Sequence, residues 1–248
     1  WNASRFALVH LAESSRHEKT PATSSATESL ADRWILSRLA HTVQQTQQNL
    51  SRYEFSVYTQ GLYDFFWRDL CDWYIEAIKP TVNSNESQRG VLAVCIDVSL
   101  RLLHPVMPFV TERLWETLNG IWPQRQHPGI IIPPSEQLIT ASWPQANTAL
   151  IDSGAERDFE QIQLLIGALR KVRITHEISP RRRLNITIKA PSEIAPSLLK
   201  TQSLITTLAN TDINGIGPIQ NRPTDATVSL VGPIELYIHG LVDTTKHR

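Results

Sequence analysis

The feature that most constrains this chain is a series of segments in its first 120 residues where apolar side chains recur every three or four positions. That spacing is the repeat of an α-helix with one buried face. It predicts helices over residues 1–17, 29–50, 55–79, 85–104 and 109–118. The joints between them are short, so the helices are expected to pack against one another as a bundle.

Local signals mark the ends of several of these helices. Ser25 and Glu28 have the spacing of a capping box in front of the second helix. Pro80 ends the third helix, because proline cannot continue the hydrogen-bond ladder. Asn119 and Gly120 form a favourable end for the fifth helix.

The composition changes over residues 120–147, which are rich in proline and contain a short β-prone run. Beyond them, amphipathic helices are expected over residues 155–178 and 195–210. Alternating apolar residues predict strands over residues 183–190, 212–217, 226–232 and 234–240. The chain is therefore expected to be mainly α, with a helical bundle over residues 1–147 and a small α+β domain over residues 148–248.

Composition excludes several classes of protein. Hydrophobic residues make up 41% of the chain and charged residues 19%, which is typical of a globular protein and not of a disordered one. No apolar run approaches the roughly 18 residues of a spanning helix, so no membrane partner is expected. Lys plus Arg and Asp plus Glu number 24 each, so any contact with nucleic acid has to be local. The two cysteines, Cys71 and Cys95, suit a reducing compartment, and a cytoplasmic location is expected.

The sequence lacks the common catalytic signatures, such as a phosphate-binding glycine loop, a nucleophile elbow or a histidine and cysteine cluster at metal-binding spacing. For His104, closing a helix is favoured over acting as a base. Asp69, Asp72 and Glu76 lie three and four residues apart on one side of the third helix. For them, ion pairing with arginines of neighbouring helices is favoured over acid–base work. No catalytic residue and no metal site are predicted.

The third helix is rich in aromatic residues and carries charged residues between the rings. At 100° per residue, one arc of this helix is apolar and is expected to face the core. It contains Phe55, Leu62, Phe66, Trp73 and Ala77. Arg68, Cys71 and Ile75 fall on the opposite arc. Apolar side chains and guanidinium planes hold unstacked RNA bases, so Arg68 and Ile75 are candidates for a binding surface. Arg5 and Phe6 form a second such pair.

A basic segment covers residues 168–190, with seven Lys or Arg and one Glu. Two interpretations stay open for it, a solvated surface and a contact with RNA phosphates. The cations between residues 170 and 173 end a helix, where the helix dipole favours them in any case. Arg181, Arg182 and Arg183 follow a proline and are the stronger candidates for phosphate contact.

The order of these segments resembles a known family. WNASRF, ADRWILSRL, LYDFFWRDLCDWYIEAIKP and LRLLHPVMPFVTERLWETL are similar to successive helices of the anticodon-binding domain of valyl-tRNA synthetases, which are class I enzymes. The synthetases for isoleucine, leucine and methionine share a version of the HP-x-x-PF-x-TE-x-LW stretch, whereas CDWYIE together with NASRF is typical of the valine enzyme. AERDFEQIQLLIGALRKVRITHEISPRRRLNITI and VGPIELYIHGLVD extend the resemblance to essentially the whole chain.

The resemblance implies a function and a set of contacts. The parent enzyme would be a valine-tRNA ligase that uses ATP to attach valine to its tRNA, and this piece would recognise the anticodon loop without a cofactor of its own. Arg5, Phe6 and Ile75 match the family positions that contact anticodon bases. Arg68 and the arginines over residues 181–183 are candidates for phosphate contact. The expected partners are a valine-specific tRNA and the catalytic and editing domains of the same chain, and the protein is expected to be a monomer.

Several parts of the valyl-tRNA synthetase family are missing from this sequence. The HIGH and KMSKS signatures, the editing domain and the C-terminal coiled coil are absent, so the sequence is interpreted as a C-terminal fragment that cannot activate valine by itself. Its RNA affinity is expected to be weak. Two alternatives remain: the anticodon domain of an isoleucyl-, leucyl- or methionyl-tRNA synthetase, and an interaction module derived from one of these that does not bind RNA.

Overall fold

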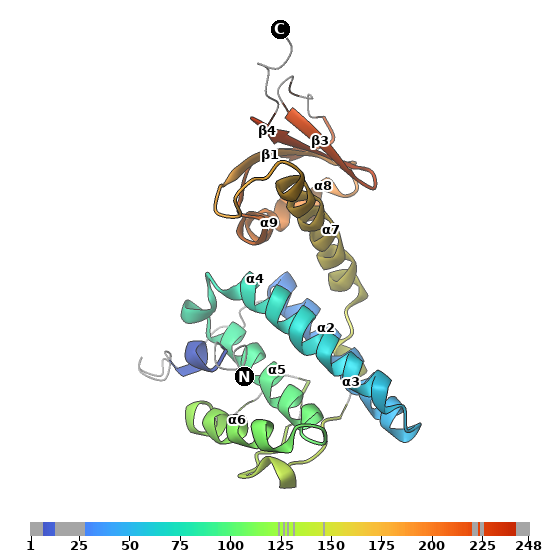
Figure 1. Ribbon diagram of the computed structural model, residues 1–248, viewed down its shortest axis with the longest axis vertical. Helices are drawn as coiled ribbons and strands as arrows, with labels where there is room; N and C mark the ends of the chain where they lie inside the picture. The colour runs from blue at the N-terminus through green and yellow to red at the C-terminus, as the bar shows by residue number, and fades with distance from the viewer. Residues whose placement is uncertain are drawn as a thin grey trace. The chain divides into compact units, whose positions relative to one another are not determined.

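The structure is a computed structural model that describes residues 7–12, 28–123, 125, 127, 129–130, 132–145, 147–219, 223 and 226–241. The chain forms two compact units, of which the first ends at Glu156 and the second begins at Arg157. Composition placed the expected boundary slightly earlier, between residues 147 and 148. The fold is mainly helical with one small sheet (Figure 1), and the predicted fold class is therefore confirmed.

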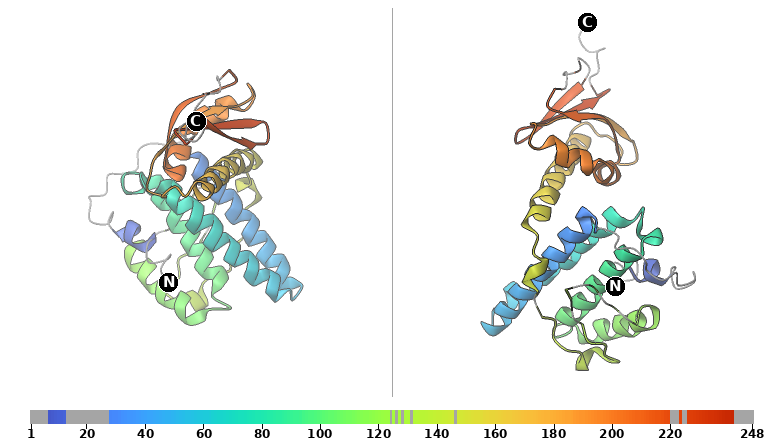
Figure 2. Two further views of the ribbon diagram at one scale, coloured as in Figure 1. Left: turned by 45° about the horizontal axis from the view of Figure 1, so that its top comes forward. Right: turned by 180° about the vertical axis from the view of Figure 1, so that it is seen from behind.

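The first unit is a bundle of helices (Figures 1 and 2). In chain order its helices are residues 7–12, α2 (Leu30–Ser51), α3 (Phe55–Tyr63), η1 (Asp64–Ile75), α4 (Glu76–Ile78), α5 (Glu86–Leu103) and α6 (Pro108–Ile121). Short 3₁₀ turns also belong to it: η2 (Val82–Ser84), η3 (Leu138–Thr140) and η4 (Thr148–Leu150). The elements α3, η1 and α4 follow one another directly and occupy the segment predicted as a single helix, but η1 is a π-helix.

α2 starts with a capping box that also connects it to η1. Ser29 Oγ accepts the backbone N–H of Asp32 at 3.2 Å, and Asp32 Oδ2 accepts the backbone N–H of Ser29 at 3.0 Å. The other carboxylate oxygen of Asp32 accepts the hydroxyl of Tyr74 at 2.7 Å, and both of these residues are buried. Ser25, the predicted cap, lies outside the described residues.

A buried group of charged and aromatic side chains, here named the Asp97 cluster (Asp97, Arg101, Trp115 and Arg125), lies between α5, α6 and the segment after α6. Asp97 accepts a hydrogen bond from Arg101 Nε at 2.6 Å and one from Arg125 Nε at 2.5 Å. Both guanidinium groups also lie over the ring of Trp115, at 4.8 and 4.6 Å from its centroid. Because every member is buried, the two cations depend on the carboxylate and on the aromatic ring for compensation.

The Asp97 cluster also binds the irregular segment that follows α6. Arg101 donates to the carbonyl oxygens of Ser142 at 2.8 Å and Pro133 at 3.0 Å. Trp115 Nε1 donates to the carbonyl of Ser135 at 3.1 Å. The described part of the segment over residues 122–145 contains no named strand, so these side-chain bonds replace a backbone ladder.

The second unit is a small α+β domain. Its elements are α7 (Ser153–Thr175), whose first turn belongs to the first unit, β1 (Leu184–Lys189), α8 (Ala195–Lys200), α9 (Gln202–Ala209), β2 (Thr211–Gly217), β3 (Ala226–Val231) and β4 (Ile234–His239). The strand order is β2-β1-β4-β3, with β1 and β2 parallel and the other neighbours antiparallel. All four predicted strands are present. The helix predicted over residues 195–210 is divided into α8 and α9 at Thr201.

Two further observations concern the described part of the chain. Cys71 and Cys95 are free thiols, the first half-buried and the second buried. No helix within the described ranges combines the length and the apolar character needed to cross a membrane.

Removing the carboxylate of the Asp97 cluster should destabilise the first unit strongly. Asp97→Ala leaves two buried guanidinium groups without their shared acceptor, which costs about 3–5 kcal/mol. Urea unfolding followed by tryptophan fluorescence measures this change, because all seven tryptophans precede Arg157.

The matched control is Glu116→Ala, which removes an equally short ion pair with Arg113 whose two side chains are 56% and 71% exposed. It should cost less than about 1 kcal/mol. Equal losses in the two variants would mean that the Asp97 cluster does not hold the unit together.

Candidate nucleic-acid interface

The N-terminal candidates Arg5 and Phe6 lie outside the described residues, but the helix that follows them is described. In this helix over residues 7–12, the ring Nδ1 of His10 lies 3.1 Å from Asn83 Oδ1. Asn83 belongs to η2, which follows the C-terminal end of the aromatic helix. Two segments more than 70 residues apart in sequence are therefore brought together at one end of the bundle.

The core face of η1 follows the period of a π-helix. Phe65, Leu70 and Ile75 are spaced five residues apart and are only 2%, 0% and 5% exposed. In a π-helix the backbone bonds run from i to i+5, and at roughly 80–85° per residue a step of four or five residues returns to within about 65° of the same side. The spacing of the buried side chains and the backbone geometry therefore agree.

The expectation that Ile75 lies on the outer surface is wrong. A helical wheel at 100° per residue assumes an α-helix, whereas a π-helix turns by roughly 80–85° per residue. Over the 12 residues of η1 the difference grows to roughly half a turn, which moves Ile75 into the core. A side chain that is 5% exposed offers a base almost no surface.

The rest of the predicted core arc also differs from the structure. Leu62 is buried as expected, but Phe66, Trp73 and Ala77 are half-buried and Phe55 is 58% exposed. Their places in the core are taken by neighbours in sequence. These are Tyr58, Phe65, Leu70, Tyr74 and Ile78.

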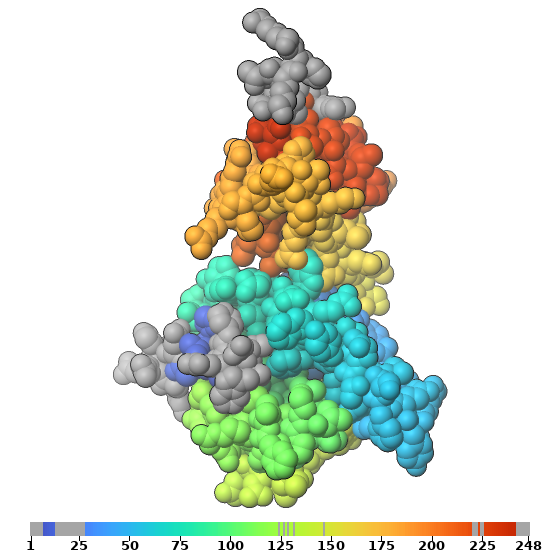
Figure 3. Space-filling view, viewed as in Figure 1, coloured from blue at the N-terminus to red at the C-terminus, as the bar shows by residue number. Residues whose placement is uncertain are grey.

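The outer face of the helix carries aromatic rings and one arginine. Tyr63 and Trp67 are about half exposed and stack with their ring centroids 6.4 Å apart and their planes 14° apart. Arg68 is exposed as predicted and forms an i,i+4 ion pair with Asp64 at 3.6 Å. In the space-filling view this segment, drawn in cyan, lies at the surface of the first unit (Figure 3). The helical wheel drawn from the sequence did not single out Tyr63 and Trp67. Exposed aromatic rings of this kind are suited to binding unstacked bases.

Of Asp69, Asp72 and Glu76, the first and the third form ion pairs, whereas Asp72 is exposed and has no ion-pair partner among the described residues. Asp69 Oδ2 lies 2.8 Å from Nε of Arg38 on α2. Burial raises the pKa of Asp69, and the Arg38 guanidinium opposes that shift. Glu76 pairs with Lys79 at 3.2 Å on its own helix. The predicted pairing with a neighbouring helix is confirmed for Asp69, whereas Glu76 pairs within its own helix.

The buried hydroxyls and the histidine of the bundle also have structural partners. Tyr58 donates its hydroxyl to the carbonyl of Leu102, and burial raises the pKa of this tyrosine to about 12. His104 ends α5, as predicted, and its Nδ1 lies 2.8 Å from Thr111 Oγ1. Within the described ranges, no three His, Cys, Asp or Glu side chains are grouped to hold a metal. These contacts describe a rigid scaffold that is suited to binding.

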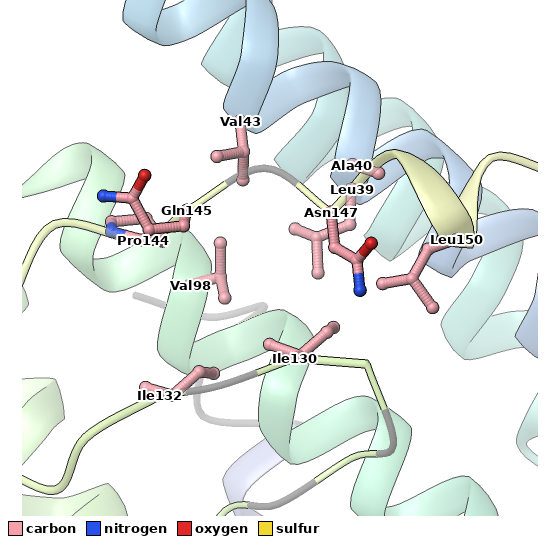
Figure 4. A pocket seen from close by; sticks show the side chains of 10 residues that line it. All are labelled: Leu39, Ala40, Val43, Val98, Ile130, Ile132, Pro144, Gln145, Asn147 and Leu150. Carbon is pink, nitrogen blue, oxygen red and sulfur yellow. The ribbon is translucent and has the colours of Figure 1, made fainter.

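Two hollows of the first unit differ in size. The first, between α2, α5 and the segment after α6, has a volume of about 20 Å³, room for about one water molecule and not for a base (Figure 4). It is lined mainly by apolar side chains such as Leu39, Val43, Val98 and Ile132. The second is an open groove of about 480 Å³ between α2 and α3. Its polar lining includes Gln45, Asn49, Gln60 and Asp64, and it contains no cation.

The remaining candidates lie in the second unit. Arg181, Arg182 and Arg183 belong to the turn between α7 and β1, and all three are exposed. Arg183 pairs with Asp212 at 2.8 Å. Arg181 and Arg182 have no ion-pair partner among the described residues.

The position of Ile75 can be tested by stability. Ile75→Ala removes a buried side chain and should lower the free energy of unfolding of the first unit by about 2–5 kcal/mol. Asp72→Ala, an exposed neighbour in the same helix, should change it by less than about 0.5 kcal/mol. Urea unfolding followed by tryptophan fluorescence is the measurement. If Ile75→Ala keeps full stability, the side chain is on the surface and the packing described here is wrong.

Comparison with known proteins identifies the family. The family model described as "Anticodon-binding domain of tRNA ligase" matches residues 32–188. A valine–tRNA ligase of Thermotoga maritima is 34% identical over 253 residues, covering 100% of this chain and 26% of that protein. One of Staphylococcus aureus is 32% identical over 99% of this chain and 27% of its own length. The chain thus spans about a quarter of the length of these relatives. It belongs to the family of anticodon-binding domains of tRNA ligases.

Proposed function

We propose that this chain is the anticodon-recognising part of a valine–tRNA ligase. The observation that carries the proposal is the family match over residues 32–188, together with valine–tRNA ligases that align with almost the entire chain. The helical bundle and the small sheet domain are the supporting architecture. Valine specificity, a monomeric state and a cytoplasmic location are parts of the same proposal.

The proposed task is binding and positioning. The relatives are about four times as long as this chain, and activation of valine with ATP and its transfer to tRNA are assigned to the rest of such a protein. Binding energy gathered at the anticodon, far from the reacting ester, can orient the acceptor end of the tRNA at the catalytic site. A rigid scaffold serves this task because it does not need to be ordered when the RNA binds.

Arg5 and Phe6 are the proposed contacts to anticodon bases. They directly precede the helix over residues 7–12, in which Ala7 and Leu11 are fully buried and which contacts η2 through His10. The support for this assignment is that Arg5 and Phe6 match the family positions expected to contact anticodon bases. Ile75 is assigned a structural role, because its side chain is buried in the core of the bundle.

The test is RNA binding by the 248-residue chain. Anisotropy of a labelled anticodon stem-loop gives Kd for the valine anticodon and for a loop with the methionine anticodon. Wild type should prefer the valine loop. Arg5→Ala and Phe6→Ala should each weaken binding of the valine loop roughly 5- to 100-fold, as expected for the loss of one stacked base contact, and should reduce the preference.

Phe109→Ala is the matched control, because Phe109 is an exposed aromatic residue of the same unit, 90% accessible, outside the proposed site. It should leave both Kd values unchanged. Equal binding of the two loops by wild type would contradict recognition of the valine anticodon. Wild-type affinity in both Arg5→Ala and Phe6→Ala would remove these residues from the site.

A further inference from the structure

The turn over residues 179–183, named the arginine turn, joins α7 to β1 in the second unit. It carries three successive arginines, and their environments differ. Arg183 Nε lies 2.8 Å from Asp212 Oδ1 and Nη2 donates to the carbonyl of Thr211 at 3.4 Å. Arg181 and Arg182 are exposed and have no ion-pair partner among the described residues. The turn therefore presents two uncompensated guanidinium groups at adjacent positions.

A buried arginine holds this turn from its inner side. Arg173 is 8% exposed, and its Nη1 donates to the carbonyls of Ser179 at 3.2 Å and Arg182 at 2.7 Å. Its Nη2 donates to the carbonyls of Ala209 at 3.1 Å and Asn210 at 2.9 Å. One guanidinium group thus ties both ends of the turn to the loop between α9 and β2.

Asn210 completes the inner contacts. Its backbone is left-handed, with φ of 50°, and its side-chain amide donates to the carbonyls of Pro180 at 3.0 Å and Arg181 at 3.3 Å. With the bonds from Arg173, every carbonyl oxygen of residues 179–182 accepts a hydrogen bond from one of these two side chains. The oxygen ends of four peptide dipoles therefore point inward, away from the exposed arginine side chains.

The charge beneath the turn adds to this arrangement. The acceptors of Arg173 are neutral carbonyls, so its charge is solvated but not cancelled, and burial lowers its pKa. In the Asp97 cluster, one carboxylate is shared by two buried guanidinium groups and cancels one of their two charges. The arginine turn thus combines an uncancelled buried cation, inward-pointing carbonyl oxygens and two free guanidinium groups, an arrangement that favours an anion.

We propose that the arginine turn is a second RNA contact, in which Arg181 and Arg182 bind backbone phosphates and Arg173 with Asn210 fixes the turn in the binding conformation. This inference rests on the proposed function, because a chain that positions a tRNA is the setting in which a phosphate contact contributes. Guanidinium groups bind phosphate oxygens in a planar, paired geometry and read no sequence. The contact therefore adds affinity without adding anticodon preference, and Arg183 serves the fold through Asp212.

The test compares salt dependence of RNA binding. The double variant Arg181→Gln/Arg182→Gln in the 248-residue chain is titrated against full-length valine tRNA and against the same tRNA with an exchanged anticodon. Both affinities should fall by the same factor. The slope of log K against log salt concentration should become shallower by roughly 1.4–1.8, since each lost phosphate contact removes about 0.7–0.9.

The matched control is Arg157→Gln/Lys200→Gln, which removes two exposed cations from other parts of the same unit. It should leave the slope unchanged. An unchanged slope in the Arg181→Gln/Arg182→Gln variant, or an equal change in the control, overturns the inference. An acidic protein partner at this turn would give that first outcome. The wild-type chain could also bind the two tRNAs equally while the double variant still shows the shallower slope. That result would contradict the proposed function and would support the phosphate contact.

A second variant tests the positioning role. Asn210→Gly keeps a residue that adopts positive φ easily but removes the amide that bonds two carbonyls of the turn. Affinity should fall roughly 3- to 10-fold, because the turn is then ordered only on binding, while the salt slope stays at the wild-type value since both cations remain. Unchanged affinity, or a change in slope, shows that Asn210 does not position the arginines. A wild-type chain that binds neither tRNA at low salt overturns both proposals.

Discussion

The first unit depends on the buried carboxylate of Asp97. Two guanidinium groups, from Arg101 and Arg125, approach it to 2.6 and 2.5 Å, and each also lies over the ring of Trp115. A cation that is buried without hydrogen-bond or charge partners is costly. Because Arg101 also binds carbonyls of the segment after α6, the ion pairs at Asp97 help to fix the path of a segment whose described part contains no named strand.

The HP-x-x-PF-x-TE-x-LW stretch has the same structural purpose. His104 is bonded to Thr111, and the carboxylate of Glu112 accepts the backbone N–H groups that open η3 at Leu138, 2.8 Å, and Ile139, 3.2 Å. The tryptophan of the motif belongs to the Asp97 cluster. The polar residues of the stretch therefore fix α6 and the segment after it.

The sequence predicted the elements well where one local rule decides them. Apolar repeats located the helices of the bundle, and alternation located all four strands. The prediction failed where the backbone is not α-helical. Nothing in DFFWRDLCDWYI indicates hydrogen bonds from i to i+5. A helical wheel drawn for an α-helix therefore placed Ile75 outside the core and Phe66 inside it. The partnership of Asp97 with Arg125, 28 residues apart, was equally out of reach, because it depends on tertiary packing.

Both units use a buried arginine to hold an irregular segment through its carbonyl oxygens, but they balance its charge differently. Asp97 is shared by Arg101 and Arg125 and cancels one of their two charges, so the electric field of this pair of arginines is reduced within the bundle. Among the described residues Arg173 has carbonyl acceptors and no carboxylate partner, and two of these carbonyls belong to the turn that carries the exposed Arg181 and Arg182. If the Arg173 guanidinium only stabilised the fold, a carboxylate next to it would be favourable, because cations repel one another and desolvation of a charge is costly. Keeping the charge uncancelled is consistent with a surface that has to attract an anion, which is the role proposed for the arginine turn.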